Sequence, residues 1–138
     1  MKKNKTPTFL LELPLTVDSG QAKRLRAHFE AARQLYNALL AEALGRLKRM
    51  RADPRWQEAR TISLAQKEER RAAFSRLREE HGFSEYSLYD FAKEANCVWI
   101  ADHIDTLMAR TLASRVYRAV NRICLGKAKG ARFKSKGR

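Results

Sequence analysis

Residues 126–138 carry the residue types best suited to binding a polyanion. This segment has three glycines, one aromatic ring and no acid, and its cations are Lys127, Lys129, Arg132, Lys134, Lys136 and Arg138. Interleaved glycines let a backbone follow phosphates closely, and Phe133 could stack on a base. We therefore predict a nucleic-acid-binding arm. The alternative is a disordered, solubilising tail.

A second group of polar side chains lies in a helical pattern near residue 35. Arg33, Tyr36 and Asn37 are spaced at i, i+3 and i+4, so they share one flank of a helix and could converge on one ligand. On spacing alone the opposite interpretation is stronger. In it, Tyr36 belongs to the apolar stripe, and Arg33 and Asn37 are its solvated neighbours.

Between residues 67 and 80 basic and acidic side chains are interleaved. Lys67, Arg70, Arg71, Arg76 and Arg78 lie among Glu68, Glu69, Glu79 and Glu80. Opposite charges three or four residues apart pair along a helix. The run therefore predicts a salt-bridged, solvated helix face rather than a nucleic-acid contact.

Candidates for catalysis are weak. Asp102, His103 and Asp105 form the closest group of titratable residues, but adjacent helix positions point about 100° apart. Cys97 and Cys124 have no second pair and no nearby His spacing, so we expect two reduced thiols in helices. Zinc-ligand, nucleophile-elbow and phosphate-loop motifs are missing from the sequence. We predict no catalytic residue, no metal site and no cofactor in this chain.

Charge and length indicate the kind of partner. The chain has 138 residues, with 29 Lys and Arg against 15 Asp and Glu, a net charge of +14. Such an excess indicates a polyanionic partner, and much of it lies in 126–138 and in Lys2, Lys3 and Lys5. No apolar run reaches the roughly 20 residues that span a bilayer. We expect no membrane partner and a cytoplasmic protein, nucleoid-associated when bound.

Periodicity predicts the elements that position these residues. Residues 8–15 alternate as a half-buried strand does, and Pro14 restricts that strand to an edge or an end. A long helix follows from Asp18 or Ser19 to about Arg51, with an apolar stripe of Ala22, Leu25, Phe29, Ala32, Tyr36, Leu39, Ala43, Leu47 and Met50.

Further helices follow along the chain. A short one is expected around Trp56, and one that opens on a Ser63–Gln66 capping box should end at Gly82. Another begins at Ser84 or Ser87, and the last runs from about Trp99 to Gly126. The predicted fold is mainly α: a bundle of about four to five helices, a short N-terminal strand, and a basic C-terminal arm that pairs with it.

Several of these segments together resemble the N-terminal part of TnpB, the transposon-encoded RNA-guided endonuclease of the OrfB type. The resemblance is carried by Phe9-Leu-Leu-Glu-Leu-Pro-Leu15, by Phe29-Glu-Ala-Ala-Arg-Gln-Leu-Tyr-Asn-Ala-Leu-Leu40, by Gly82-Phe-Ser-Glu-Tyr-Ser-Leu88 and by the arm. It spans essentially the whole chain.

The resemblance implies an organisation and a set of partners. Residues 1–17 would form a wedge-type strand segment, 18–125 a helical recognition domain, and 126–138 an arm returning to the wedge. The partners would be a guide-like RNA, a DNA target and a downstream nuclease half. The family's RuvC-like carboxylates and zinc-binding cysteines lie further downstream, so this chain would be a truncated product, a deliberate fragment or a decayed gene, and not itself an enzyme.

Two alternatives remain open. The chain is one piece of a working RNA-guided endonuclease that a separate nuclease half completes, or it is a helical module for protein interaction or self-association.

Overall fold

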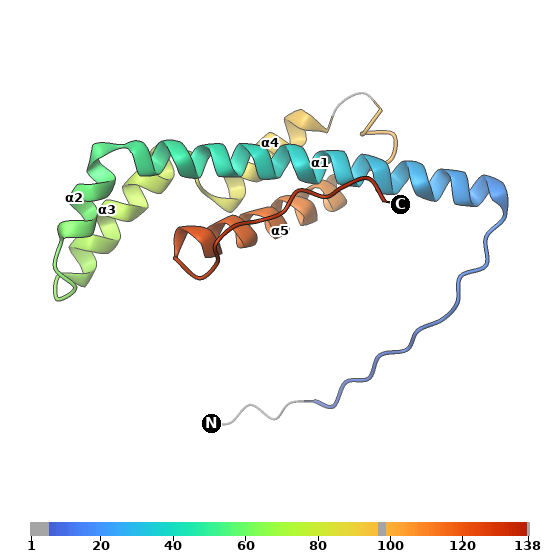
Figure 1. Cartoon of the computed structure of the whole chain (residues 1–138), viewed down its shortest axis with the longest axis horizontal. Helices are drawn as coiled ribbons and strands as arrows, with labels where there is room; N and C mark the ends of the chain where they lie inside the picture. Colours follow the sequence, from blue (N-terminus) through green and yellow to red (C-terminus); the bar gives the residue numbers. More distant parts are fainter. Residues whose placement is uncertain (1–5, 97–98, 138) are drawn as a thin grey trace.

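In the computed structural model, which describes residues 6–96 and 99–137, the chain is mainly α-helical. This confirms the predicted class. The elements of the described part are, in order, α1 (Ser19–Ala52), α2 (Pro54–Thr61), α3 (Lys67–Glu80), α4 (Glu85–Ala95) and α5 (Thr106–Cys124). Figure 1 shows that α4 and α5 lie along α1, while α2 and α3 form a hairpin at the end where α1 stops.

Local sequence sets the limits of α1. Asp18 accepts a hydrogen bond from the Gln21 amide at 2.8 Å, and the Gln21 side chain accepts one from the Asp18 amide at 3.0 Å, so the helix starts on a reciprocal capping box. At the other end Pro54 cannot continue the hydrogen-bond ladder. Asp53 ends α1 there, and its side chain caps α2 through the Arg55 amide.

Two glycines end helices in the left-handed conformation. Gly82 has φ 62° and Gly126 has φ 70°. After α3, the Phe83 amide donates to the Arg78 carbonyl at 2.8 Å, and after α5 the Lys127 amide donates to the Arg122 carbonyl at 2.8 Å. These are the closing bonds of Schellman motifs. Both predicted stops at glycine are confirmed.

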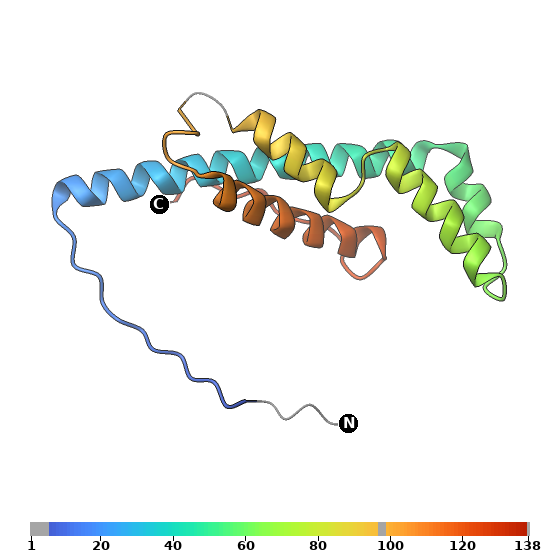
Figure 2. The same cartoon turned by 180° about the vertical axis from the view of Figure 1, so that it is seen from behind.

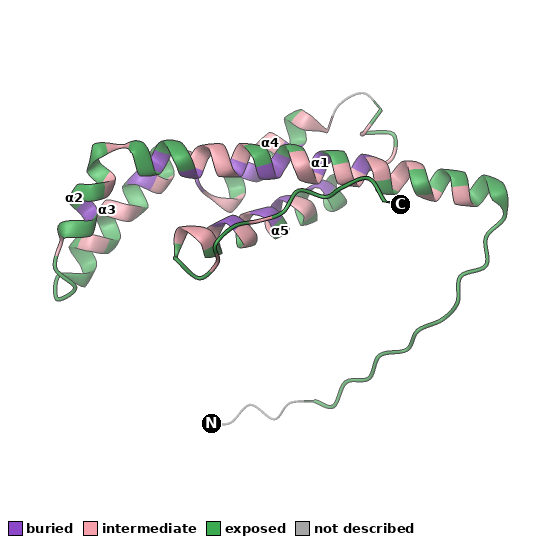
Figure 3. Cartoon of the chain, viewed as in Figure 1, coloured by how far each residue is buried: buried purple, intermediate pink, exposed green. Residues whose placement is uncertain are grey.

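The core lies where α1, α4 and α5 meet, as the buried stripe in Figure 3 shows. In the second half of α1 the predicted stripe is confirmed, since Leu39, Ala43, Leu47 and Met50 are buried. In the first half the prediction holds in part, since Ala32 and Tyr36 are partly buried and pack against the core, but it is wrong at Phe29. There the buried positions are Ala31 and Leu35, and Phe29 is 70% exposed. The first turns of α1 extend past α4 and α5 (Figure 1), so apolar side chains there have little to pack against.

The predicted N-terminal strand is wrong for the described residues. Residues 6–18 form no regular element and are all exposed, and Figure 2 shows this segment leaving the helices as an extended trace. An isolated strand has no partner for its backbone groups. The predicted pairing of the arm with this segment is also wrong, because the arm lies along the helices instead.

Three further expectations need correction. Helix α3 begins at Lys67 without a side-chain cap, because Ser63 Oγ accepts from the Ala65 amide instead. Helix α5 begins at Thr106, not near Trp99, because Asp105 caps it through the Met108 amide at 2.7 Å. The expected Arg–Glu pairs within α3 are missing from the ion pairs of the described residues.

Cys124 is the last residue of α5 and a free thiol whose pKa is raised by burial. Cys97 lies outside the described residues.

Among the described residues, none of the helices is both long and apolar enough to cross a membrane.

Candidate nucleic-acid interface

The basic arm runs back along α1 in the opposite direction to that helix (Figure 1). Lys129, Gly130 and Ala131 border a hollow formed with Leu47, Arg51 and their neighbours near the C-terminal end of α1. An extended chain rises about 3.3 Å per residue and a helix about 1.5 Å, so each arm residue passes about two helix residues. Lys134 accordingly reaches Asn37.

Asn37 fixes the arm at this point by its main chain. Its Oδ1 accepts a hydrogen bond from the Lys134 amide at 2.8 Å, and its Nδ2 donates to the Lys134 carbonyl at 2.9 Å. Arg33 Nη1 donates to the same carbonyl at 3.1 Å, and Lys134 Nζ lies 5.5 Å from the centre of the Tyr36 ring. Arg33, Tyr36 and Asn37 therefore converge as predicted, but the group they contact is Lys134 of the chain's own arm.

Arg33 is held from its other side by Glu30. Arg33 Nη2 and Nε donate to the Glu30 carboxylate at 2.6 and 2.9 Å. Hydrogen bonds from Arg33 and then Gln34 lower the pKa of Glu30 to about 2, and the charge of Lys136 contributes less. The hydrogen bonds with Glu30 also raise the pKa of Arg33. Glu30 and Arg33 form a fixed pair that aims the remaining guanidinium nitrogen at the arm.

A hollow of about 450 Å³ lies beside this anchor. Its cations come from three elements: Arg33 of α1, Arg115 and Arg118 of α5, and Lys134 of the arm. Apolar and aromatic lining comes from Phe29, Ala32, Tyr36 and Leu112. Guanidinium and ammonium groups bind phosphate, and aromatic rings stack on bases.

Two carboxylates moderate the charge of this hollow. Glu30 pairs with Arg33. Glu85 lies in the field of Arg118, and its pKa is lowered chiefly by hydrogen bonds with Ser114 and Tyr89 and less by that charge. Neither acid lines the hollow itself.

Sequence reasoning missed part of this site. It did not identify Arg115 and Arg118, although their i, i+3 spacing on the helix that leads into the arm was a readable signal. Phe29 was assigned to the core but lies at the rim of the hollow.

The other predicted arm residues lie outside the Asn37 anchor. Lys127 closes the Schellman motif after α5 with its main chain. Lys129 borders a hollow of about 360 Å³ that also includes Lys48 and Arg51. Arg132, Phe133 and Lys136 are exposed, and Arg138 lies outside the described residues. The arm therefore presents cations to solvent while its main chain is held.

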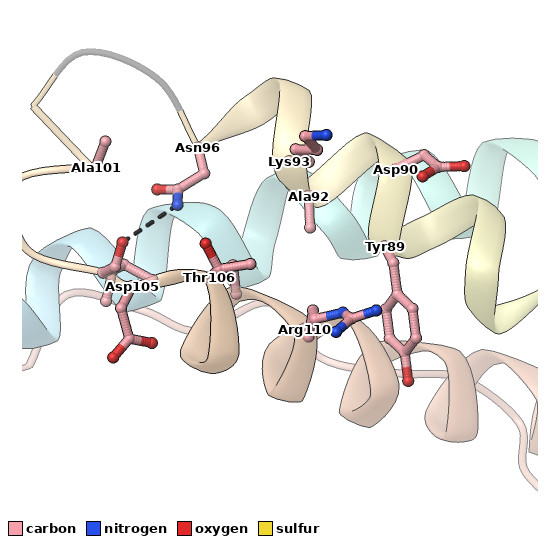
Figure 4. A pocket seen from close by; sticks show the side chains of 11 residues that line it. Tyr89, Asp90, Ala92, Lys93, Asn96, Ala101, Asp105, Thr106 and Arg110 are labelled. Carbon is pink, nitrogen blue, oxygen red and sulfur yellow. Dashed lines mark hydrogen bonds between the residues drawn. The ribbon is translucent and has the colours of Figure 1, made fainter.

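A further hollow, of about 600 Å³, lies between α4 and the start of α5 (Figure 4). Most of its polar groups already have structural roles. Asn96 Nδ2 donates to the Ile104 carbonyl at 3.2 Å, Asp105 caps α5, and the Arg110 guanidinium lies 5.3 Å from the Tyr89 ring centre. We therefore place the candidate interface at the arm.

The acid and histidine cluster at 102–105 does not assemble as a unit. His103 Nδ1 lies 3.2 Å from His28 Nδ1, and Asp105 caps α5. The described residues contain no group of three or more His, Cys, Asp or Glu side chains placed to hold a metal ion.

Comparison with protein-family models, with curated proteins and with solved structures found no match to this chain.

Proposed function

We propose that this chain is the nucleic-acid-binding module of a TnpB-like RNA-guided DNA endonuclease, and that it holds guide-like RNA, and the guide–target duplex, through charge and shape. In such systems base pairing reads the sequence while the protein reads backbone geometry. DNA cleavage would belong to a separate RuvC-like nuclease half, so this chain alone would not be an enzyme.

The observation that carries the proposal is the fixed main chain of the arm. Asn37 and Arg33 hold Lys134 beside a hollow with Arg115 and Arg118. A disordered tail would lose conformational entropy when it bound, whereas an arm held in place presents its cations with less such loss. The anchored arm therefore favours binding over the solubilising tail.

Salt dependence tests the proposal. We would titrate a labelled structured RNA at several salt concentrations and follow fluorescence anisotropy. The logarithm of the association constant should fall linearly with the logarithm of salt concentration, because bound cations displace counterions from the phosphates. Binding that is missing, or that does not respond to salt, would contradict the proposal.

A matched pair of variants locates the contact. Arg115→Gln with Arg118→Gln should weaken RNA binding and make the salt slope shallower by about one to two phosphate contacts. Lys23→Gln with Arg26→Gln removes the same charge from the exposed first turns of α1 and should leave the slope nearly unchanged. Equal effects of both pairs would indicate attraction by net charge alone.

The proposal also requires that the chain not cleave DNA. Purified chain incubated with DNA and Mg²⁺ should leave the DNA intact. Cleavage that persists through stringent purification, together with the chain, would overturn the assignment of catalysis to a separate half.

The exposed N-terminal segment favours a second candidate function, namely interaction with a protein or self-association. Phe9, Leu11, Leu13 and Leu15 are all exposed, and exposed apolar segments mark interaction sites. Light scattering with and without RNA separates the two functions. A stable dimer that ignores RNA would support this second function over the first.

A further inference from the structure

A second basic hollow lies between the α2–α3 hairpin and the end of α5, apart from the Asn37 anchor. Its volume is about 420 Å³, within the range of ligand-binding clefts. It is lined by Trp56, Arg60, Arg70, Arg71, Phe74, Ser75, Arg78, Cys124 and Leu125. It therefore combines four guanidinium groups with two aromatic rings and has no acid in its lining.

The aromatic part of this hollow is already ordered. Trp56 and Phe74 pack edge to face, with ring centres 4.9 Å apart and planes at 72°. Both rings are only half-buried, so they retain surface facing the hollow. A planar, heteroaromatic ligand could cover that surface by stacking.

Two of the four arginines hold the walls. Arg70 Nη1 donates to the carbonyls of Arg60 and Ile62 at 2.8 and 2.7 Å, which satisfies the end of α2. Arg78 ties α3 to α5 by donating to Asn121 Oδ1 at 3.0 Å and Tyr117 Oη at 3.3 Å.

The other two arginines are exposed at the hollow. Arg71 and Arg60 form no ion pair among the described residues, and neither do Arg70 and Arg78. The glutamates of α3 do not neutralise Arg70, Arg71 and Arg78, although they lie only a few residues away on the same helix. Four guanidinium groups near one hollow repel each other unless an anion joins them.

We propose that this hollow is a nucleotide-binding site, in which the base of a nucleoside phosphate stacks on Trp56 with its edge towards Phe74, whose plane lies at 72° to that of Trp56, while Arg60 and Arg71 bind its phosphate. The site goes beyond the arm interface and does not depend on it. The nucleoside phosphate could be a free nucleotide or an unpaired nucleotide of a strand, and the two have the same recognition chemistry.

Tryptophan fluorescence tests the site directly. Trp99→Phe keeps an aromatic ring beside His103 and leaves Trp56 as the one tryptophan. In this background we would titrate AMP, ribose 5-phosphate and a tetraribonucleotide of adenosine. AMP and the tetranucleotide should quench Trp56, because the base stacks on it. Tighter binding of the tetranucleotide would identify a strand as the source, and equal affinities would identify a free nucleotide.

Paired variants make the test specific. Arg60→Gln with Arg71→Gln should weaken AMP binding about tenfold or more, as expected when charged hydrogen bonds to phosphate are lost. Lys23→Gln with Arg26→Gln removes the same charge from the first turns of α1 and should change the affinity for AMP little. Circular dichroism checks that each variant is folded.

Three results would overturn the proposal. The first is that neither AMP nor the tetranucleotide quenches Trp56. The second is that quenching is the same in the Arg60→Gln, Arg71→Gln variant as in the parent protein. The third is that ribose 5-phosphate binds as tightly as AMP. AMP lacks the phosphate backbone that the arm would follow, so AMP can bind this hollow even if the arm does not bind RNA. Conversely, if AMP does not bind, salt-dependent RNA binding by the arm can still be observed.

Discussion

Asn37 uses both atoms of its side-chain amide on the main chain of Lys134. Asn37→Ala should therefore release the arm while the helices stay folded. Because the two hydrogen bonds are exposed, the free energy of unfolding should fall by only about 0.5–1.5 kcal/mol. Exchange of the Lys134 amide, which donates to Asn37 Oδ1, should accelerate roughly two- to tenfold, as expected for a loss of that size, and NMR measures it.

Gln34→Ala is the matched control for this change. Gln34 donates to Glu30 at 3.1 Å and does not contact the arm. Exchange of the Lys134 amide should keep its native rate in that variant. Unchanged exchange in Asn37→Ala would show that Arg33 and packing of Ala131 hold the arm without the amide.

Glu30 gives the protein a defined acid sensitivity. Its pKa in the folded chain is about 2, below the ordinary value of 4.5, so folding favours the charged form. The pair with Arg33 contributes its full stability above about pH 4.5, and that contribution is lost as the pH falls towards 2. The Glu30 side chain keeps about a quarter of its surface in solvent, so screening by water should keep the effect modest.

Urea unfolding at a series of pH values measures this contribution. Glu30→Gln should lower the urea midpoint at pH 7 and lower it much less at pH 2, where the Glu30 carboxyl of the folded protein is about half protonated. Glu94→Gln serves as control, because Glu94 is exposed and belongs to no ion pair of the described residues. A constant difference between native protein and Glu30→Gln at all pH values would contradict the assignment.

At the scale of elements, two helix ends depend on left-handed glycines. Gly126→Ala should cost about 1 kcal/mol from backbone conformation alone, since nothing lies within 4 Å of the added Cβ. Gly82→Ala should cost more, because its Cβ would come 3.2 Å from Arg46 Nη1, which donates to the Gly82 carbonyl. Thermal melts followed by circular dichroism should show a lower melting temperature for Gly82→Ala than for Gly126→Ala.

Gly45→Ala is a control of opposite sign. Gly45 lies inside α1, and the one close atom for an added Cβ is at the end of the flexible Arg49 side chain. Alanine there should stabilise the helix by about 0.5–1 kcal/mol. If all three alanine variants shifted the melting temperature in one direction, conformation at the glycines would not be the cause.

The helices and their glycine stops could be predicted from the sequence because their signals are local. Capping residues, periodic apolar positions and Gly82 or Gly126 act within a few residues. The stripe of α1 failed at Phe29 because burial depends on where α4 and α5 end, which periodicity does not report. The spacing of Arg33, Tyr36 and Asn37 predicted that their side chains could converge. It could not identify the residue they contact, because Lys134 lies 97 residues from Asn37 in sequence.

At the scale of the whole molecule, residues 6–18 stand apart from the helices and expose their apolar side chains, with Phe9 90% exposed. Extended apolar segments pair readily with other chains. We predict concentration-dependent self-association of the isolated protein through this segment. Leu11→Lys with Leu13→Lys should reduce it, because two charges oppose burial and strand pairing, while helical content and melting temperature stay unchanged.

Sedimentation velocity over a range of protein concentrations measures this association. Thr6→Lys with Thr8→Lys adds the same charge to the same segment but keeps its leucines, so this control should still associate. If both lysine pairs abolish association equally, net charge rather than the apolar side chains controls it. If the native chain stays monomeric throughout, the segment does not drive contacts between copies, and a different protein remains as its partner.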